Sequence, residues 1–270
     1  MEHLQNLHMH STYCDGKNTP REIAEWALAH GFESIGYSGH SYMHWKNEMM
    51  NPETTEKYKK EIKALKKEYE GRLGIYLGTE FEMHSEIDLS GYDYIIASTH
   101  YFKIGEKYVG FDSTKENIKK IIDEYFCGDG LAFTKAYYEQ ISNLPSRGSF
   151  DIVGHFDICA KHAETTDYFD AGSAKYRSYA IEAAEALAGK IPFFEVNTGA
   201  ISRGYKKVPY PEPFIIKEFK RLGLGAVITS DCHDMTKMDA HFYHAAELLL
   251  SLGFKERYIL TDSGFTAVKL

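Results

Sequence analysis

The chain has 270 residues, a formal net charge of −8 and a hydrophobic fraction of 43%. No run approaches the roughly 20 apolar residues that cross a bilayer, and the N-terminus reads as a strand rather than a secretory signal. The acidic balance supplies no general basic surface for long nucleic acids. We therefore expect a soluble, cytoplasmic protein, with residues 1–270 forming a single α/β domain.

The four cysteines are scattered along the chain with no C-x-x-C pair: Cys14, Cys127, Cys159 and Cys232. This spacing implies neither a disulfide framework nor a thiolate zinc site, so we expect reduced thiols. Cys14 and Cys232 stand beside candidate metal ligands, and we interpret both as small packing residues.

The first apolar run, residues 4–10, predicts a strand that carries His8 and His10 near its end. Because side chains alternate along a strand, both imidazoles point to the same side, and Met9 between them points to the other layer. Two imidazoles on one side can hold one metal ion, so the opening of the chain predicts a chelate.

The following segments predict a helix, a strand and a second helix. Thr19-Pro20-Arg21-Glu22 is a capping box with proline at the first helical position, and the helix should end near His30, before Gly31. Residues 34–37 predict a strand that leads into Gly39-His40. The helix predicted at 53–70 mixes lysine with glutamate, which indicates a solvated face rather than an anion-binding surface.

Strand and helix patterns continue to alternate, which indicates a mostly parallel sheet. Residues 101–113 carry no clear pattern and either conceal or replace an element. Further strands are expected at 74–82, 94–98, 152–154, 192–197, 225–229 and 258–260.

Ligand-type residues stand at or just beyond the carboxyl ends of six predicted strands: His8 and His10, His40, Glu80, His100, His155, and Asp231 with His233. Taken singly, each would be an ordinary polar residue at a strand end. An open sheet spreads its strand ends along a line, whereas a closed parallel barrel brings them together at one rim. The pattern therefore favours a closed barrel with a polynuclear metal centre.

The motifs at these positions are Leu7-His8-Met9-His10-Ser11-Thr12, Asp15-Gly16, Gly39-His40, Gly78-Thr79-Glu80, Ser98-Thr99-His100, Gly154-His155-Phe156-Asp157 and Ser230-Asp231-Cys232-His233. With the strand Glu195-Val196-Asn197-Thr198-Gly199 and Arg203, they resemble the polymerase and histidinol phosphatase (PHP) superfamily. Within it, the chain resembles the stand-alone histidinol-phosphate phosphatases over essentially its whole length. The resemblance implies a distorted (β/α)7 barrel, similar to a TIM barrel, with a trinuclear metal centre. It also implies a phosphoric monoester hydrolase that converts L-histidinol phosphate to L-histidinol and phosphate in histidine biosynthesis.

The family pattern, carried over residue by residue, implies three divalent metal ions. One is held by His8, His10, Glu80 and Asp231, the second by Glu80, His100 and His155, and the third by Asp15, His40 and His233. The Asp15 position is a histidine in some PHP proteins, so we expect its oxygen ligand to alter the affinity or preference of the third site. Mixed imidazole and carboxylate ligands suit zinc, manganese or iron and do not choose among them.

Phosphate monoesters hydrolyse extremely slowly in water, so both a strong nucleophile and charge neutralisation are needed. Cation binding lowers the pKa of water from about 15.7 towards about 7 in favourable zinc sites, and a hydroxide bridging two ions can then attack phosphorus directly. The candidate catalytic residues are Glu80, Asp231, His233 and Asp15. The leaving alcohol takes its proton from Asp15, His233, Asp231 or a metal-bound water.

Three residues are candidates for binding the substrate. Arg203 follows a glycine-containing turn and is the first candidate for a phosphate clamp, and Lys161 beyond His155 would offer a point charge. His44, with Tyr42 and Trp45 nearby, could meet the imidazole and ammonium groups of histidinol, although loop packing is the slightly favoured interpretation of these three residues.

Two alternatives use the same residues. The metal set does not encode the alcohol half of the substrate, so a related phosphoesterase could act on nucleotides or nucleic-acid ends. A non-catalytic metal or phosphate sensor would keep the fold without turnover. A small-molecule phosphate monoester is the expected partner, with neither long nucleic acid nor a membrane.

Overall fold

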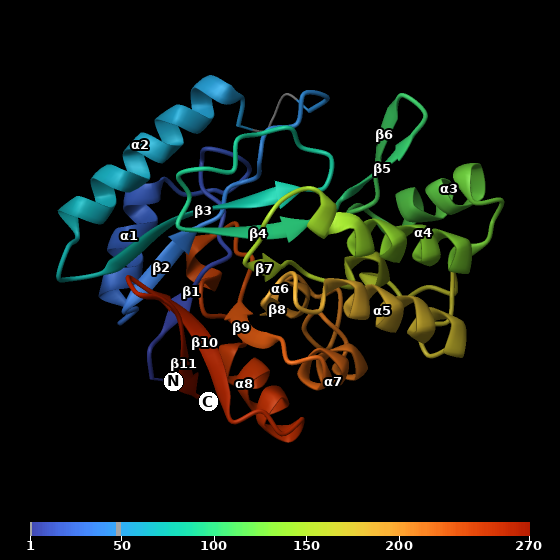
Figure 1. Cartoon of the computed structure of the whole chain (residues 1–270). Coiled ribbons are helices and arrows are strands. Elements are labelled where there is room, and N and C mark those ends of the chain that lie inside the picture. Colours follow the sequence, from blue (N-terminus) through green and yellow to red (C-terminus); the bar gives the residue numbers. More distant parts are fainter. Residues whose placement is uncertain (1, 47–49) are drawn as a thin grey trace.

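A seven-stranded sheet forms the centre of the computed structural model, which describes residues 2–46 and 50–270 (Figure 1). All neighbouring strands in this sheet are parallel. The strand bounds predicted at 34–37, 74–82, 94–98 and 225–229 are confirmed. In sheet order the strands are β1 (Gln5–Asn6), β2 (Ser34–Tyr37), β3 (Gly74–Glu82), β4 (Tyr94–Ser98), β7 (Ile152–Val153), β8 (Phe193–Asn197) and β9 (Gly225–Thr229).

The sheet closes into a barrel through the residues that follow β1 and β9. Met9 and Cys232 form a parallel bridge: His10 N donates to Cys232 O at 3.0 Å, and Cys232 N donates to His8 O at 3.3 Å. The strand predicted over residues 4–10 is therefore too long, because the ladder with β2 stops at Asn6. Residues 8–10 instead span the gap between β2 and β9, and this seam carries both histidines of the predicted chelate.

Helices cover the outside of the barrel. In Figure 1, α1 and α2 lie beside β1 to β3, and α4 and α5 lie on the opposite side of the barrel. The predicted capping box is present at the start of α1: Glu22 N donates to Thr19 Oγ1 at 3.3 Å, and Thr19 N donates to Glu22 Oε2 at 2.8 Å. The helices are α1 (Pro20–Ala29), α2 (Pro52–Glu68), α3 (Lys115–Tyr125), α4 (Gly130–Asn143), α5 (Ala174–Leu187), α6 (Gly199–Ser202), α7 (Pro213–Arg221) and α8 (Phe242–Ser251).

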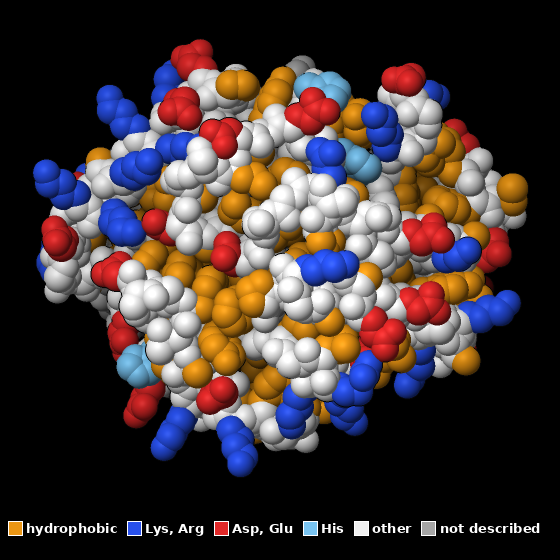
Figure 2. All heavy atoms as spheres, viewed as in Figure 1, with side chains coloured by type: hydrophobic (Ala, Val, Ile, Leu, Met, Phe, Trp, Pro, Cys, Tyr) orange, Lys and Arg blue, Asp and Glu red, His pale blue; other side chains and the backbone are white. Residues whose placement is uncertain are grey.

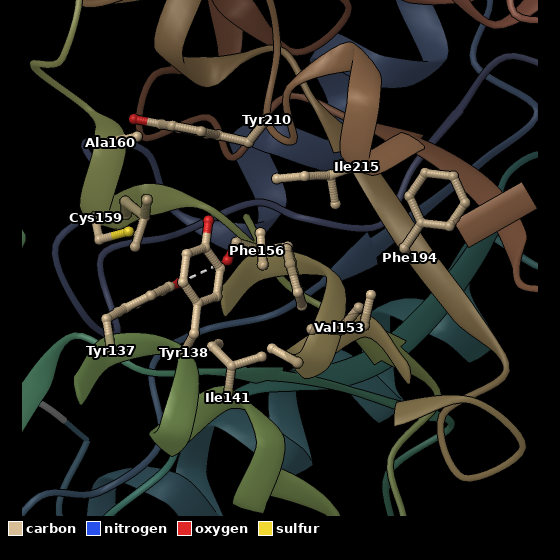
Figure 3. Packing of buried hydrophobic residues seen from close by; sticks show 14 of the residues in the cluster. Tyr137, Tyr138, Ile141, Val153, Phe156, Cys159, Ala160, Phe194, Tyr210 and Ile215 are labelled. Atoms are coloured by element: carbon tan, nitrogen blue, oxygen red, sulfur yellow. Dashed lines mark hydrogen bonds between the residues drawn. The ribbon is translucent and has the colours of Figure 1, made fainter. Parts of the chain in front are cut away.

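The largest apolar cluster joins α4, α5 and α7 to the second half of the barrel (Figure 3). Tyr137 and Ile141 of α4, Val153 of β7 and Phe194 of β8 all belong to this cluster. The Tyr137 hydroxyl donates to the Phe156 carbonyl oxygen at 3.0 Å, directly after the predicted ligand His155. This packing fixes the loop that follows β7.

Two antiparallel hairpins lie outside the barrel sheet. The unpatterned segment 101–113 conceals β5 (Tyr101–Ile104) and β6 (Lys107–Gly110). The strand predicted at 258–260 is β10 (Glu256–Thr261), which pairs with β11 (Gly264–Lys269) and does not join the parallel sheet. The reason is a side-chain contact: the Gln5 amide donates to Leu260 O and accepts from Leu260 N, both at 2.8 Å, which sets β10 against the start of β1.

The lysine-rich helix α2 presents a solvated surface, as predicted. On the face in Figure 2, basic and acidic side chains are interspersed over this helix at the upper left. Lys57 pairs with Glu53 at 2.7 Å, and Lys66 pairs with Asp93 at 3.1 Å. In the part of the chain that the structure describes, neither α2 nor any other helix combines the length and apolarity needed to cross a membrane.

Tyr94 fills the interior of the barrel below the predicted ligands. Along β3, Tyr76, Gly78 and Glu80 share the inward face by strand alternation. The Tyr94 ring occupies the space that glycine leaves at Gly36 and Gly78, and its hydroxyl donates to the Leu7 carbonyl oxygen. The interior is thus an apolar plug up to Gly78, and the next inward residue of β3 is Glu80.

The change Gly78→Ala should destabilise the protein, because the added methyl group would overlap the Tyr94 ring. We expect the free energy of unfolding to fall by about 1–3 kcal/mol, measured by urea denaturation. The matched control is the same change in a Tyr94→Leu background, where the loss should be smaller. Equal losses in the two backgrounds would contradict the packing explanation.

Candidate metal centre

The nine predicted ligands converge at one end of the barrel and form three groups of potential metal ligands. Glu80 lies on β3 itself, and the others lie on the segments that follow β1, β2, β4, β7 and β9. The groups are His8, His10 and Asp231; Glu80, His100 and His155; and His10, Asp15, His40 and His233. The structure therefore brings together every residue that the sequence selected as a ligand.

The three side chains of the first group and Glu80 of the second face one another below the surface. His8 Nε2 lies 3.6 Å from Asp231 Oδ1 and 3.5 Å from Glu80 Oε2, and His10 Nε2 lies 3.2 Å from the same Asp231 oxygen. His8 Nε2, His10 Nε2 and Glu80 Oε2 are buried without a hydrogen-bond partner among the described residues. Buried polar atoms are rarely left unpaired, and two imidazole nitrogens converging on carboxylate oxygens fit a divalent cation.

Glu80 links the first group to the second. Its Oε2 faces His8 and His10 and lies 2.9 Å from His40 Nδ1, whereas its Oε1 lies 2.9 Å from His155 Nε2 and 3.4 Å from His100 Nε2. The Glu80 side chain is only 1% exposed. One carboxylate with an oxygen in each group is the arrangement expected of a bridging ligand, as the sequence predicts.

The third group is the most open to solvent. The Asp15 carboxylate lies 3.5 Å from His40 Nε2 and 3.3 Å from His233 Nε2, and the side chains of Asp15 and His233 are 44% and 32% exposed. His10 Nδ1 is also 3.5 Å from Asp15, so His10 lies between the first and third groups. The prediction placed His10 in the first group alone.

Electrostatic contacts hold Glu80, Asp231 and His10 in ligand-competent protonation states, whereas neighbouring carboxylates outweigh burial and raise the pKa of four other histidines: His8, His40, His100 and His233. Burial alone would raise the pKa of Glu80, but His40, His8 and His100 hold it well below its usual range. Burial would likewise raise the pKa of Asp231, but Arg203 and His8 lower it well below its usual range. Burial and the neighbouring His233 and His40 lower the pKa of His10 to about 3, so its imidazole is neutral at neutral pH.

Two buried carboxylates behind the ligands form contacts that the sequence reasoning missed. Glu195 Oε2 lies 2.7 Å from His8 Nδ1 and accepts from Thr229 Oγ1 at 2.7 Å. Its other oxygen accepts from His155 N and from Asn197 Nδ2. A ligand histidine is commonly oriented in this way, because an acceptor at one ring nitrogen leaves the other lone pair for the metal.

Glu82 orients the ring of His100 in the same way as Glu195 orients that of His8. Its Oε2 accepts from His100 N at 2.8 Å and lies 2.9 Å from His100 Nδ1. A sequence signal for both residues exists: each is a glutamate on the inward face of a buried strand, where an unpaired charge would be costly.

The backbone at Asp231 is unusual, because this non-glycine residue has a φ of +49°. Left-handed geometry at such a residue costs about 1 kcal/mol or more and persists where the surroundings impose it. Arg203 supplies part of that constraint: its guanidinium donates to Asp231 O and to Asp231 Oδ2, both at 2.9 Å.

A cavity of about 450 Å³ opens above the ligands, and two of the three predicted substrate-binding residues line it. Arg203 is held by Asp231, as described, and Lys161 Nζ lies 2.7 Å from Asp112 Oδ1. His44 is not among the lining residues; its ring meets those of Trp45 and Tyr108 edge to face. The substrate role of His44 stays a prediction, and its described contacts are those of loop packing.

The two cysteines beside the candidate ligands differ in burial: Cys232 is buried, and Cys14 is partly exposed. Burial raises the pKa of Cys232 to about 12, which keeps its thiol protonated at neutral pH. Cys14 Sγ lies 3.5 Å from His10 Nδ1, the ring nitrogen that also faces Asp15. Neither cysteine belongs to a ligand group among the described residues.

The amino-acid sequence of the chain is similar to a known domain family and to two known proteins. A PHP domain model matches residues 6–199 of the chain. The chain is 26% identical over 265 residues to the probable histidinol-phosphatase of Deinococcus radiodurans, covering 94% of this chain and 95% of that protein. It is 29% identical over 250 residues to the histidinol-phosphatase of Bacillus subtilis, covering 84% and 92% of the two chains.

A solved structure has the same fold. The histidinol phosphate phosphatase of Lactococcus lactis, crystallised with zinc, L-histidinol and phosphate, matches with a TM-score of 0.74 and 24% identity. The match covers 98% of this chain and 99% of that one. The seven-stranded parallel barrel is therefore the fold of a known metalloprotein, as well as the architecture that the sequence predicts.

The change Glu195→Gln should weaken metal binding without removing a ligand. Each Glu195 oxygen accepts from two donors, so a side-chain amide would set an N–H group against one pair of them. We expect metal affinity to fall about 10-fold to 100-fold, measured by competition with a chelator of known affinity. Glu182→Gln on the exposed side of α5 is the matched control. Unchanged affinity in Glu195→Gln would exclude an orienting role.

Proposed function

This chain belongs to the PHP domain family, and we propose that it is a metal-dependent phosphatase that hydrolyses L-histidinol phosphate to L-histidinol and phosphate. One observation carries the proposal: Glu80 presents an oxygen to each of two ligand groups beneath a cavity lined by Arg203 and Lys161. The names of relatives that match nearly the whole chain support this substrate over other phosphate monoesters. We place the reaction in histidine biosynthesis, in the cytoplasm.

The ligand residues fit three divalent cations, with zinc, manganese and iron as the chemically suitable ions. His8, His10, Asp231 and Glu80 would hold the first, and Glu80, His100 and His155 the second. Asp15, His40 and His233 would hold the third. When bound, such cations supply an activated water near neutral pH and neutralise charge on the phosphoryl oxygens.

The protein's own residues prepare the site before substrate arrives. Glu195 and Glu82 hold the rings of His8 and His100 in fixed orientations, so little reorganisation accompanies the reaction. Arg203 and Lys161 place positive charge on the cavity wall, where the phosphate group enters. The half-exposed edge formed by Asp15 and His233 gives solvent access for proton exchange with the leaving alcohol.

Metal-dependent phosphate release tests the proposed reaction. Protein stripped with a chelator and reconstituted with zinc, manganese or ferrous iron should hydrolyse L-histidinol phosphate in steady-state assays. We expect kcat/KM for L-histidinol phosphate to exceed that for nucleoside monophosphates by about 100-fold or more, because polar groups in the site select the alcohol half. The Asp231→Asn variant should lose turnover, because Asp231 faces both His8 and His10.

Each contrary outcome identifies a different function. Preference for nucleoside monophosphates would make the protein a nucleotide phosphoesterase. Stoichiometric binding of phosphate esters by metal-loaded protein without phosphate release would make it a sensor.

Arg203→Lys tests the phosphate clamp. Lysine keeps the charge but lacks the planar guanidinium, which donates to Asp231 O and Oδ2 together and can bind two phosphate oxygens at fixed geometry. We therefore expect the variant to bind phosphate more weakly. We expect kcat/KM to fall about 10-fold to 100-fold, with a weaker inhibition constant for inorganic phosphate. Metal content, measured on the same samples, controls for the contact with Asp231. Unchanged phosphate inhibition together with lost metal would assign Arg203 to holding Asp231 alone.

A further inference from the structure

Two cavities meet at the metal centre. The larger, of about 450 Å³, is the one described above, and a smaller cavity of about 340 Å³ adjoins it. Both are lined by Asp15, His40, His100 and Asp112. A substrate whose phosphate lies at the metal centre can therefore extend its other end into the second cavity.

The larger cavity contains more cationic side chains than the smaller one, alongside the carboxylates of Asp15, Glu80, Asp112, Asp231 and Asp234. The larger is lined by four cationic side chains: Lys17, Lys161, Arg203 and Lys237. Among the described residues, Lys46 is the one lysine or arginine that lines the smaller cavity, whose walls also include Met43 and Tyr101. The larger cavity thus offers cations that can approach the phosphate, and the smaller offers the carboxylates of Asp15 and Asp112, beside Lys46, to a positively charged group.

Asp112 is held at the junction by its chain neighbours. Phe111 N donates to the carbonyl oxygen of the ligand His100 at 2.9 Å, and His162 Nε2 lies 3.0 Å from Ser113 O. These contacts fix the backbone on both sides of Asp112 and place it beside the metal centre. The junction is therefore a preformed part of the site, although Asp112 belongs to none of the ligand groups.

The Asp112 carboxylate is available for a second contact. Its Oδ1 accepts from Lys161 Nζ at 2.7 Å, whereas Oδ2 has no hydrogen bond within residues 2–46 and 50–270. The side chain is 36% exposed, so a ligand can reach it. Burial alone would raise the pKa of Asp112, but Lys161 and His100 lower it below its usual value, so the carboxylate is ionised at neutral pH.

We propose that the smaller cavity takes the amino-alcohol half of the substrate and that Asp112 binds its ammonium group, which makes Asp112 a specificity-determining residue. This inference rests on the proposed function, since L-histidinol phosphate carries an ammonium group two bonds from the ester carbon. Lys161 holds one oxygen of Asp112 towards the larger cavity, and the ammonium group pairs with the other. A simpler role, in which Asp112 only orients Lys161 for phosphate, makes a different prediction.

The test compares two substrates with the metal-loaded Asp112→Asn variant. One is L-histidinol phosphate, and the other is 3-(imidazol-4-yl)propyl phosphate, which lacks only the amine. We expect kcat/KM for L-histidinol phosphate to fall about 10-fold to 100-fold, with a change of less than about 3-fold for the amine-free ester. Inhibition by L-histidinol should weaken by a similar factor, whereas inhibition by inorganic phosphate should not change.

Two control variants make the result specific. Glu106→Gln removes the same charge from the exposed turn of the β5–β6 hairpin and should leave both substrates unaffected. Lys161→Met should impair both substrates alike, because its charge serves the phosphate. Metal content and melting temperature confirm that each variant is folded and loaded.

The remaining outcomes overturn the inference or the function separately. Equal losses for the two substrates in Asp112→Asn would show that Asp112 acts through Lys161, and no loss for either would remove it from the site. A wild-type enzyme that hydrolyses both esters equally well would refute ammonium recognition while leaving the phosphatase intact. A metal-loaded wild-type enzyme that hydrolyses neither ester would refute the proposed function itself.

Discussion

The structure depends on one constraint: a fully buried carboxylate, Glu80, must be compensated from two sides. Its oxygens face His8 and His10 on one side and His100 and His155 on the other, and its side chain is 1% exposed. Without such partners, the free-energy cost of burying an ionised carboxylate in that position would be too high for a stable fold. Only a closed barrel brings the ends of β1, β3, β4 and β7 close enough to provide them.

The rigidity of this arrangement comes from the layers below and behind it. Tyr94 plugs the barrel directly beneath the ligands, and it fits because Gly36 and Gly78 have no side chains. Glu195 and Glu82 then lock the rings of His8 and His100 from behind. The site is thus built on β3 and on segments that directly follow other strands of the barrel, which favours fixed ligand geometry.

Substrate selection follows from what surrounds this rigid centre. The ligands themselves recognise a phosphate group and carry no information about the alcohol. We propose that this information lies in the residues around the ligands, where Arg203 pairs with Asp231 and Lys161 pairs with Asp112. Each cation is held by a carboxylate, so its position is fixed although it lies on a segment that follows a strand.

The sequence by itself determined the strand and helix alternation, the bounds of β2, β3, β4 and β9, and the nine candidate ligands that the structure brings together, because these depend on local patterns of side-chain alternation and on motifs at strand ends. It did not determine the partners of Glu195 and Glu82, the hairpin within 101–113, the place of β10 outside the barrel, or the pairing of Asp112 with Lys161. Most of these features join residues far apart in the chain, such as His8 and Glu195 or Gln5 and Leu260. Their positions are set by strand register and by barrel closure at Met9 and Cys232, and only the tertiary structure decides both.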